Sequence, residues 1–341
     1  MVGLAAGQDV TREDILSWNK NAVYLRFAVK KAKGNITVAS DVALSKVKIY
    51  VSDYPGDADF ATPGLKKVAN IATGRQDGAV YGGYLFSLNS SGVCKVYSTD
   101  TYKAVTEFVL YKSDVIMPHS NSVCFGSYKY AETDEFPLLY CNVYNTYKND
   151  RSYDGMCCVY RIQRNGSSFF SSLVQIIKVG FTNDTQKWSS PGGDTRPFGN
   201  FVVDTDNNRL YAFTMRDADK STRFFAFPLP APTDGTLDSA TGALKVTLNA
   251  ADVVDSFQTP YFNYIQGATY HGGKIYSLEG FTDNATNRAA LKVVDLAAKQ
   301  LCETIDLYGM NLKTEPEIVY VLDGKGYYSD VSGNIYEFPI K

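Results

Sequence analysis

The sequence predicts an all-β protein, a five-bladed β-propeller with a small N-terminal extension. Three observations lead to this prediction: a strand-forming composition, a module that recurs five times, and tight-turn residues between the pieces of each module. The chain contains 25 Tyr and 19 Phe, which favour strands, against 2 Trp. Apolar residues make up 45% of the 341 residues, an ordinary share for a globular protein.

The repeated module has three strand-like pieces in a fixed order. The first begins with polar or small residues and runs into aliphatics, the second follows a tight turn and is rich in Tyr and Leu, and the third carries a Val-Tyr or Phe-type core. The copies span residues 76–97, 119–162, 197–227, 265–295 and 315–338. Asp-Gly, Gly-Gly, Asn-Asn and Ser-Gly pairs between the pieces supply the positive φ that tight hairpins need. Antiparallel hairpins in a repeated module indicate propeller blades.

A fourth strand-like run follows in most copies, as in Ala104–Leu110, Leu173–Val179 and Leu301–Leu307, and the candidate in the third copy is Ala243–Leu248. The fifth copy has no fourth run, but Leu65–Ile71 precedes the first copy. Because an open ring leaves unpaired strand edges, we expect this N-terminal run to supply the outer strand of the last blade. An ordinary two-sheet sandwich accounts for the strand content but not for the fivefold order.

Residues 1–60 do not fit the module, so we divide the chain into this N-terminal segment and a propeller over residues 65–341. Thr11 and Asp14 resemble a capping box before a short helix that reaches Trp18. Alternating strands are expected at 23–27 and 47–51. The segment is either a cap on the propeller or an attachment or oligomerisation element.

Charge, hydropathy and cysteine spacing argue against a nucleic-acid-binding protein, a membrane-spanning protein and a cysteine metal site. The net charge is −2 without a basic stripe, which argues against a nucleic-acid partner. The first residues lack a signal-peptide pattern and no run approaches a membrane span, so we expect synthesis in a cytoplasm. The six cysteines lie in apolar runs without CxxC spacing, which predicts buried, reduced thiols rather than a metal site; they are Cys94, Cys124, Cys141, Cys157, Cys158 and Cys302.

Polar residues open the first strand of every copy, where a propeller narrows to its central channel. Convergent polar groups in a concavity are the default prediction for a binding site. The competing interpretation is that these groups pair with one another and with channel waters. The predicted channel-mouth residues are Gln76, Asp77, His119, Asn121, Arg196, Asn200, Gln266, Glu315 and Glu317.

Catalysis and metal binding have weaker support. Glu315 and Glu317 share a strand face, which suits acid and base roles, but Pro316 between them also explains the pattern as a strand start. His119, Asp77 and a serine are the residue types of a Ser-His-Asp triad, but no G-x-S-x-G motif, which marks the nucleophilic serine in many hydrolases, supports this assignment. His119, Asp77 and the glutamates provide at best a hard-cation oxygen site. We therefore predict no catalytic residue, no metal and no cofactor.

Aromatic residues in loops are a second candidate surface, namely Trp188, Tyr261 and Tyr264 beside amide side chains. Sugar C–H faces pack on rings, and sugar hydroxyls need donors and acceptors, so this combination suits carbohydrate. The alternative is that the rings cover the outer cores of the blades.

A resemblance bears on function. The strand openings His119-Ser120-Asn121 and Ile265–Ala268, followed by Lys274-Ile275-Tyr276, resemble the propeller of some bacteriophage receptor-binding proteins and helveticin-like proteins over residues 65–341. The resemblance implies a recognition domain for cell-surface polymers and a virion-attached N-terminal part. The chain lacks the long helical stalk and collagen-like shaft of the best-known members, so the mode of attachment is open.

The first functional hypothesis is a non-enzymatic phage tail or fibre protein that binds a host surface glycan. Its partners are then a glycan or other phage structural proteins, with a homo-oligomer formed through the N-terminal segment, and its location is the virion. The alternatives are a bacterial propeller lyase or hydrolase acting at the channel mouth, or a scaffold for protein partners, both in the bacterial cytoplasm.

Overall fold

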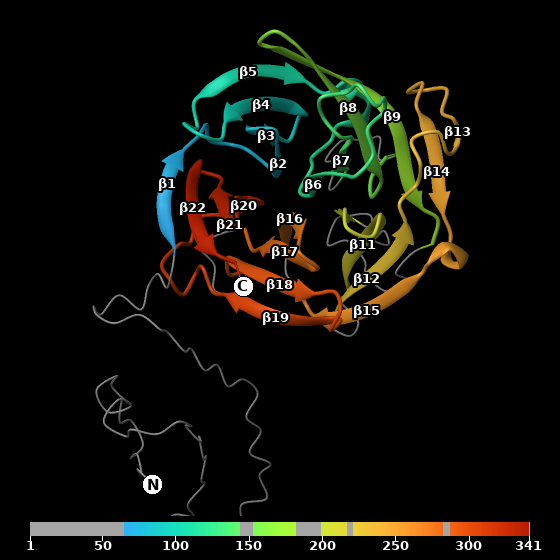
Figure 1. Cartoon of the computed structure of the whole chain (residues 1–341). Helices are drawn as coiled ribbons and strands as arrows, with labels where there is room; N and C mark the ends of the chain where they lie inside the picture. The colour runs from blue at the N-terminus through green and yellow to red at the C-terminus, as the bar shows by residue number, and fades with distance from the viewer. Residues whose placement is uncertain are drawn as a thin grey trace, which may run out of the picture. The chain divides into compact units, whose positions relative to one another are not determined.

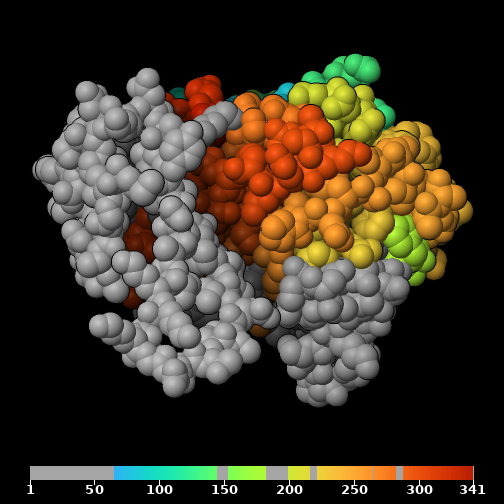
Figure 2. All heavy atoms as spheres, turned by 90° about the horizontal axis from the view of Figure 1, so that it is seen from below, coloured from blue at the N-terminus to red at the C-terminus, as the bar shows by residue number. Residues whose placement is uncertain are grey.

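The computed structural model describes residues 65–143, 153–181, 199–216, 221–262, 264–281 and 287–340. These residues form five β-sheets arranged around one axis, the five-bladed β-propeller that the repeat predicts (Figure 1). The view from the edge of the ring shows residues of the later blades, in orange and red, lying side by side (Figure 2). The predicted boundary at residue 65 between propeller and N-terminal segment stays a prediction, because residues 1–64 lie outside the described part.

Each blade begins with its innermost strand and continues outward. Blade 1 contains β2 (Gly78–Tyr81), β3 (Tyr84–Leu88), β4 (Val93–Ser98) and β5 (Ala104–Val109). Blade 2 contains β6 (Val123–Phe125), β7 (Leu139–Asn142), β8 (Cys157–Asn165) and β9 (Ser168–Val179). Blade 3 contains β10 (Asn200–Asp204), β11 (Arg209–Arg216), β12 (Ser221–Pro228) and β15 (Asp255–Pro260). Blade 4 contains β16 (Ile265–His271), β17 (Lys274–Glu279), β18 (Ala290–Asp295) and β19 (Gln300–Ile305).

The last blade joins the two ends of the repeat region. It contains β20 (Pro316–Leu322), β21 (Lys325–Asp330) and β22 (Asn334–Pro339), and its outer strand is β1 (Lys66–Asn70). β1 pairs antiparallel with β22, so that Lys66 lies opposite Glu337 and Asn70 opposite Asn334. This pairing confirms the predicted closure and protects the edge of β22.

The hydrophobic core is divided among the five junctions between blades. Successive side chains of a strand point to opposite faces, and both faces of a blade are covered by its neighbours. Leu85 therefore packs with blade 5 residues such as Ile318, whereas Phe86 packs with blade 2 residues such as Phe136. For the same reason the adjacent Cys157 and Cys158 lie in different clusters. This double burial explains why inner and middle strands such as β3 and β18 read as apolar runs rather than alternating patterns.

One strand assignment was wrong. The run predicted as the fourth strand of the third copy, Ala243–Leu248, contains β14 (Leu244–Leu248), which pairs parallel with β9 of blade 2. A short strand, β13 (Thr236–Leu237), extends that sheet further. The fourth strand of blade 3 is β15, where Phe257 lies opposite Phe224 with ring centroids 4.8 Å apart. β15 carries few aliphatic residues, so its sequence gave a weaker strand signal.

The cysteines follow their prediction with one exception. Five thiols are buried and free, but Cys302 on the outer strand β19 is exposed. Helix is restricted, among the described residues, to α2 (Ser113–Ile116) and the 3₁₀ turn η1 (Ala250–Asp252). In this part of the chain no helix has the length and apolarity needed to cross a membrane.

Candidate functional site

The five innermost strands run in the same direction, so their starts gather at one end of the axis, here called the amino end, and their last residues gather at the other, the carboxyl end. Neighbouring inner strands contact one another around the axis (Figure 1). The predicted channel-mouth residues that the structure describes precede or begin these strands, so they belong to the amino end.

The carboxylate of Asp77 ties four blades together near this end. Its Oδ2 accepts hydrogen bonds from the backbone N–H of Val123 (2.8 Å) in blade 2 and of Ala268 (3.2 Å) in blade 4. Its Oδ1 accepts from the N–H of Val319 in blade 5 (3.4 Å). The side chain is fully buried, and burial raises the pKa of Asp77, an effect that these backbone donors oppose.

A second buried network joins blade 2 to blades 3 and 4. Nδ2 of Asn121 donates to the carbonyl of Ile265 (2.6 Å), and Nδ2 of Asn142 donates to Oδ1 of Asn121 (2.5 Å). Ser122 Oγ accepts from the N–H of Phe201 (2.9 Å). The polar side chains on the axis, Asp77 and Asn121 among them, therefore also hold neighbouring blades together through hydrogen bonds. Sequence reasoning missed Asn142, because it ends a second strand and no spacing links it to the axis.

Close approach of the inner strands restricts one further position. A Cβ atom on Gly267 would collide with the carbonyl oxygen of Glu317 in the adjacent blade and lie 3.1 Å from Oδ1 of Asp77. A residue without a side chain is required here because β16 and β20 meet at the axis.

A further layer of the amino end is a set of hydrogen-bonded polar side chains. Nε2 of His119 lies 2.7 Å from Oε1 of Gln76, whose Nε2 donates to Oε1 of Glu317 (3.3 Å). Nε2 of Gln266 donates to Oε1 of Glu315 (2.7 Å). Gln76, His119, Gln266 and Glu315 are half-buried, whereas Glu317 is fully buried. The structure thus brings together predicted residues from four blades.

Two of these residues occupy irregular positions in their strands. The register between β16 and β17 shifts around Gln266, and that between β20 and β21 shifts around Glu317. Bulges of this kind re-aim a side chain out of the regular alternation and are frequent next to functional sites.

The amino end is acidic. Burial raises the pKa of Glu315 to about 7, and the Gln266 donor opposes this. Burial also raises the pKa of Glu317, assisted by the negative charges of Glu315, Asp77 and Asp330. Among the described residues, neither glutamate forms an ion pair with Lys or Arg, and Oε2 of Glu317 has no hydrogen-bond partner. In the same part of the chain, no three His, Cys, Asp or Glu side chains are grouped so that they could hold a metal ion.

The remaining predicted residues do not join this layer in the described structure. Arg196 and Trp188 lie outside the described residues. Asn200 is buried at the start of β10, and neither its Oδ1 nor its Nδ2 has a partner in the described part. Tyr261 packs against the blade 3–4 core, as the alternative interpretation of the loop aromatics predicts. Tyr264 is 41% exposed, and its ring centroid lies 4.5 Å from that of Phe281.

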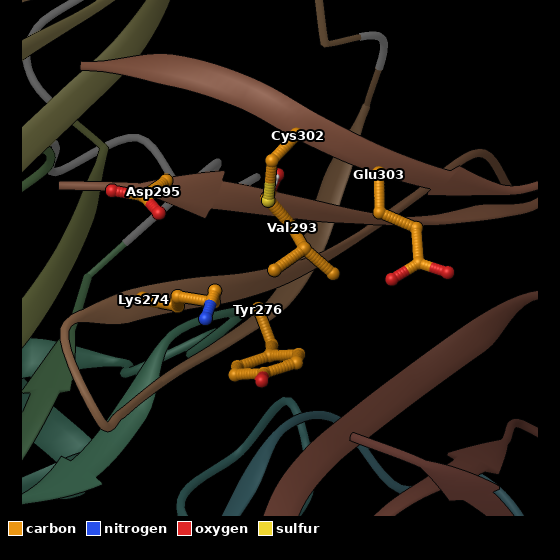
Figure 3. A pocket seen from close by; sticks show the side chains of 6 residues that line it. All are labelled: Lys274, Tyr276, Val293, Asp295, Cys302 and Glu303. Carbon is orange, nitrogen blue, oxygen red and sulfur yellow. Dashed lines mark hydrogen bonds between the residues drawn. The ribbon is translucent and has the colours of Figure 1, made fainter. Parts of the chain in front are cut away.

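A hollow of about 270 Å³ lies away from the axis, on one face of blade 4 (Figure 3). Lys274 and Tyr276 of β17 face it together with Val293 and Asp295 of β18, because residues two apart share a strand face. The outer strand β19 adds Cys302 and Glu303. No inner strand contributes to its lining, so we place the candidate site on the axis instead.

Comparison with known proteins finds only distant structural likeness. No protein-family model matches the chain, and no curated protein matches it. Many solved structures resemble it. Glutaminyl cyclase of Myxococcus xanthus aligns over 80% of this chain and 94% of its own, with 10% identity and a TM-score of 0.45. The Swd1 β-propeller domain of Myceliophteria thermophila aligns over 81% and 100%, with 9% identity and a TM-score of 0.41. BamB from Moraxella catarrhalis aligns over 77% and 71%, with 12% identity and a TM-score of 0.31. Such low scores carry no inference about ligand or activity.

Proposed function

We propose that the protein is a non-enzymatic recognition protein of a bacteriophage tail or fibre, and that the amino end of its propeller binds a host surface glycan. The sequence resemblance to phage receptor-binding propellers supports the virion role. A five-bladed propeller is itself compatible with either a binding protein or an enzyme.

One observation carries the glycan proposal: Gln76, His119, Gln266 and Glu315 present half-buried amide, imidazole and carboxyl groups from four blades at one end of the axis. Vicinal sugar hydroxyls both donate and accept hydrogen bonds, so they need such mixed partners. Because these side chains are already bonded to one another in pairs, they are oriented before a ligand arrives, which lowers the entropy lost on binding.

A glycan array with the full-length protein tests the proposal. We expect binding to a restricted set of surface glycans, which Gln76→Ala or Gln266→Ala weakens about tenfold by removing one polar partner, about 1.4 kcal/mol. Gln300→Ala, an exposed amide on β19, is the matched control and should bind like the wild type. Absence of any glycan ligand, or equal binding by all three variants, contradicts the proposal.

The acidic pair favours an enzyme as the second candidate. A carboxyl whose pKa lies near 7, as in Glu315, suits general acid catalysis. Glu317, two residues further along the chain in β20, supplies a second carboxyl group. Prolonged incubation of a bound glycan with the protein distinguishes the two candidates. Shortened or unsaturated products that disappear in Glu315→Gln support the enzyme, whereas an unchanged glycan supports recognition.

A further inference from the structure

We propose a second ligand site, at the carboxyl end of the axis, that takes an uncharged saccharide ring. A cavity of about 410 Å³ opens there, here called the funnel. Its volume lies within the range of small-molecule sites. It shares no residue with the amino end, so the inference is independent of the proposed function.

All five blades build the funnel. Its wall includes residues in the last few positions of the inner strands or just beyond them, among them Tyr81, Phe125, Thr205, Tyr270 and Tyr320. A concavity to which every repeat contributes one strand end is a property of the closed ring. No single blade contains the site.

The lining is uncharged. The described residues around the funnel are only Ala, Val, Tyr, Cys, Phe, Gly, Ser, Pro and Thr. A ligand with a net charge would lose its hydration here without gaining an ion pair, which disfavours phosphate, carboxylate and ammonium groups. The funnel therefore differs in chemistry from the acidic amino end.

The aromatic rings of the funnel are held in place. The ring of Tyr81 lies 5.4 Å from that of Phe125, and the hydroxyl of Tyr320 is 2.9 Å from that of Tyr102. The hydroxyl of Tyr270 donates to Asp206 (2.7 Å) and accepts from the N–H of Gly273 (3.0 Å). Tyr81 is 38% exposed, so part of its ring surface remains available to a ligand.

Hydroxyl groups lie among these rings. Thr205 is exposed and Thr269 half-buried, and in the described part of the chain neither hydroxyl makes a hydrogen bond. Fixed aromatic surface next to unbonded hydroxyls matches a pyranose, whose C–H face packs on a ring while its hydroxyls need neutral partners. An aliphatic ligand would leave the threonine hydroxyls unbonded.

Saturation-transfer NMR on the full-length protein tests the site with the methyl glycosides of glucose, galactose and mannose. We expect at least one to bind in the millimolar range, and glucuronic acid and glucosamine to bind about fivefold more weakly or not at all. Tyr81→Ala should weaken the bound glycoside about fivefold or more by removing exposed ring surface. Thr269→Val, which keeps the shape of the side chain and removes its hydroxyl, should also weaken glycoside binding. This second variant keeps the site testable if Tyr81→Ala does not fold.

The controls separate this site from the amino end. Tyr111→Ala removes a tyrosine that is 50% exposed outside the funnel, so this variant should bind the glycoside like the wild type. The inference is overturned if no methyl glycoside binds, if Tyr81→Ala and Thr269→Val both retain full affinity, or if the charged sugars bind equally well. Loss of binding in Gln266→Ala alone would place the glycoside at the amino end instead.

Discussion

The side chain of Asp77 links the inner strand of blade 1 to those of three other blades. Its two oxygens accept backbone N–H groups from blades 2, 4 and 5. In Asp77→Asn, one accepting oxygen becomes an NH₂ group that faces backbone donors, so buried donors lose their partner. We expect the free energy of unfolding to fall by about 2–4 kcal/mol in urea titrations. Asp100→Asn, an exposed control, should unfold with the wild type, and an unchanged midpoint for Asp77→Asn would show that the axis does not need this carboxylate.

Glu315 makes stability depend on pH. Burial raises its pKa from 4.5 to about 7, so between these values the folded chain holds a proton that the unfolded chain releases. Stability due to this group is therefore present below about pH 4.5 and is lost as the pH rises through about 7.

Glu315→Gln should remove this dependence. Relative to the wild type, the free energy of unfolding of the variant should rise by about 1–2 kcal/mol when the pH is raised from 5 to 8. This is less than the full pKa shift corresponds to, because the side chain is partly solvated. Urea unfolding at both pH values measures it, with the exposed Glu132→Gln as control. A variant that gains nothing at the higher pH would place the pKa of Glu315 near its ordinary value.

At the scale of elements, the sequence predicted most strands but not every partner. The hairpins were predictable because turn residues with positive φ, such as Gly272, Gly273 and Gly324, separate apolar runs. The partner of β14 was not, because adjacency along the chain favours blade 3, whereas β14 pairs with β9 through a parallel ladder. Pairing between distant strands depends on packing that no local pattern encodes.

The same limit applies to the two ends of the axis. Gln76, His119, Gln266 and Glu315 were predictable because they stand directly before or at the start of apolar runs in equivalent copies. The funnel was not predictable, because its lining consists of Val, Thr, Tyr and similar residues that are common near strand ends. They form a cavity only because the ends of five inner strands come together in the folded ring. The bulge at Glu317 likewise depends on the register of β20 against β21.

At the scale of the whole molecule, stability depends on closing the ring. Each junction between blades has its own hydrophobic cluster, and the junction between blades 5 and 1 includes Ile71, directly after β1, with Ile318 and Ile335. The backbone N–H of Ile71 also donates to the carbonyl of Gly333 (2.8 Å). Residues near the start of the described chain thus complete both a sheet and a core that the C-terminal strands begin.

Two truncations separate the roles of the N-terminal residues. A chain that begins at Gly64 keeps β1 and Ile71, whereas a chain that begins at Ala72 loses both and leaves β22 with an open edge. We expect the first to unfold cooperatively at the temperature of the full-length propeller. The second loses several ladder hydrogen bonds and part of a core, so its melting temperature should fall by about 10 °C or more, with self-association through the free edge. Calorimetry and light scattering measure both effects. If the chain from Gly64 melts as low as the chain from Ala72, residues 1–63 stabilise the propeller and are not a separate attachment segment; if both match the full-length protein, the β1–β22 pairing does not hold the ring closed.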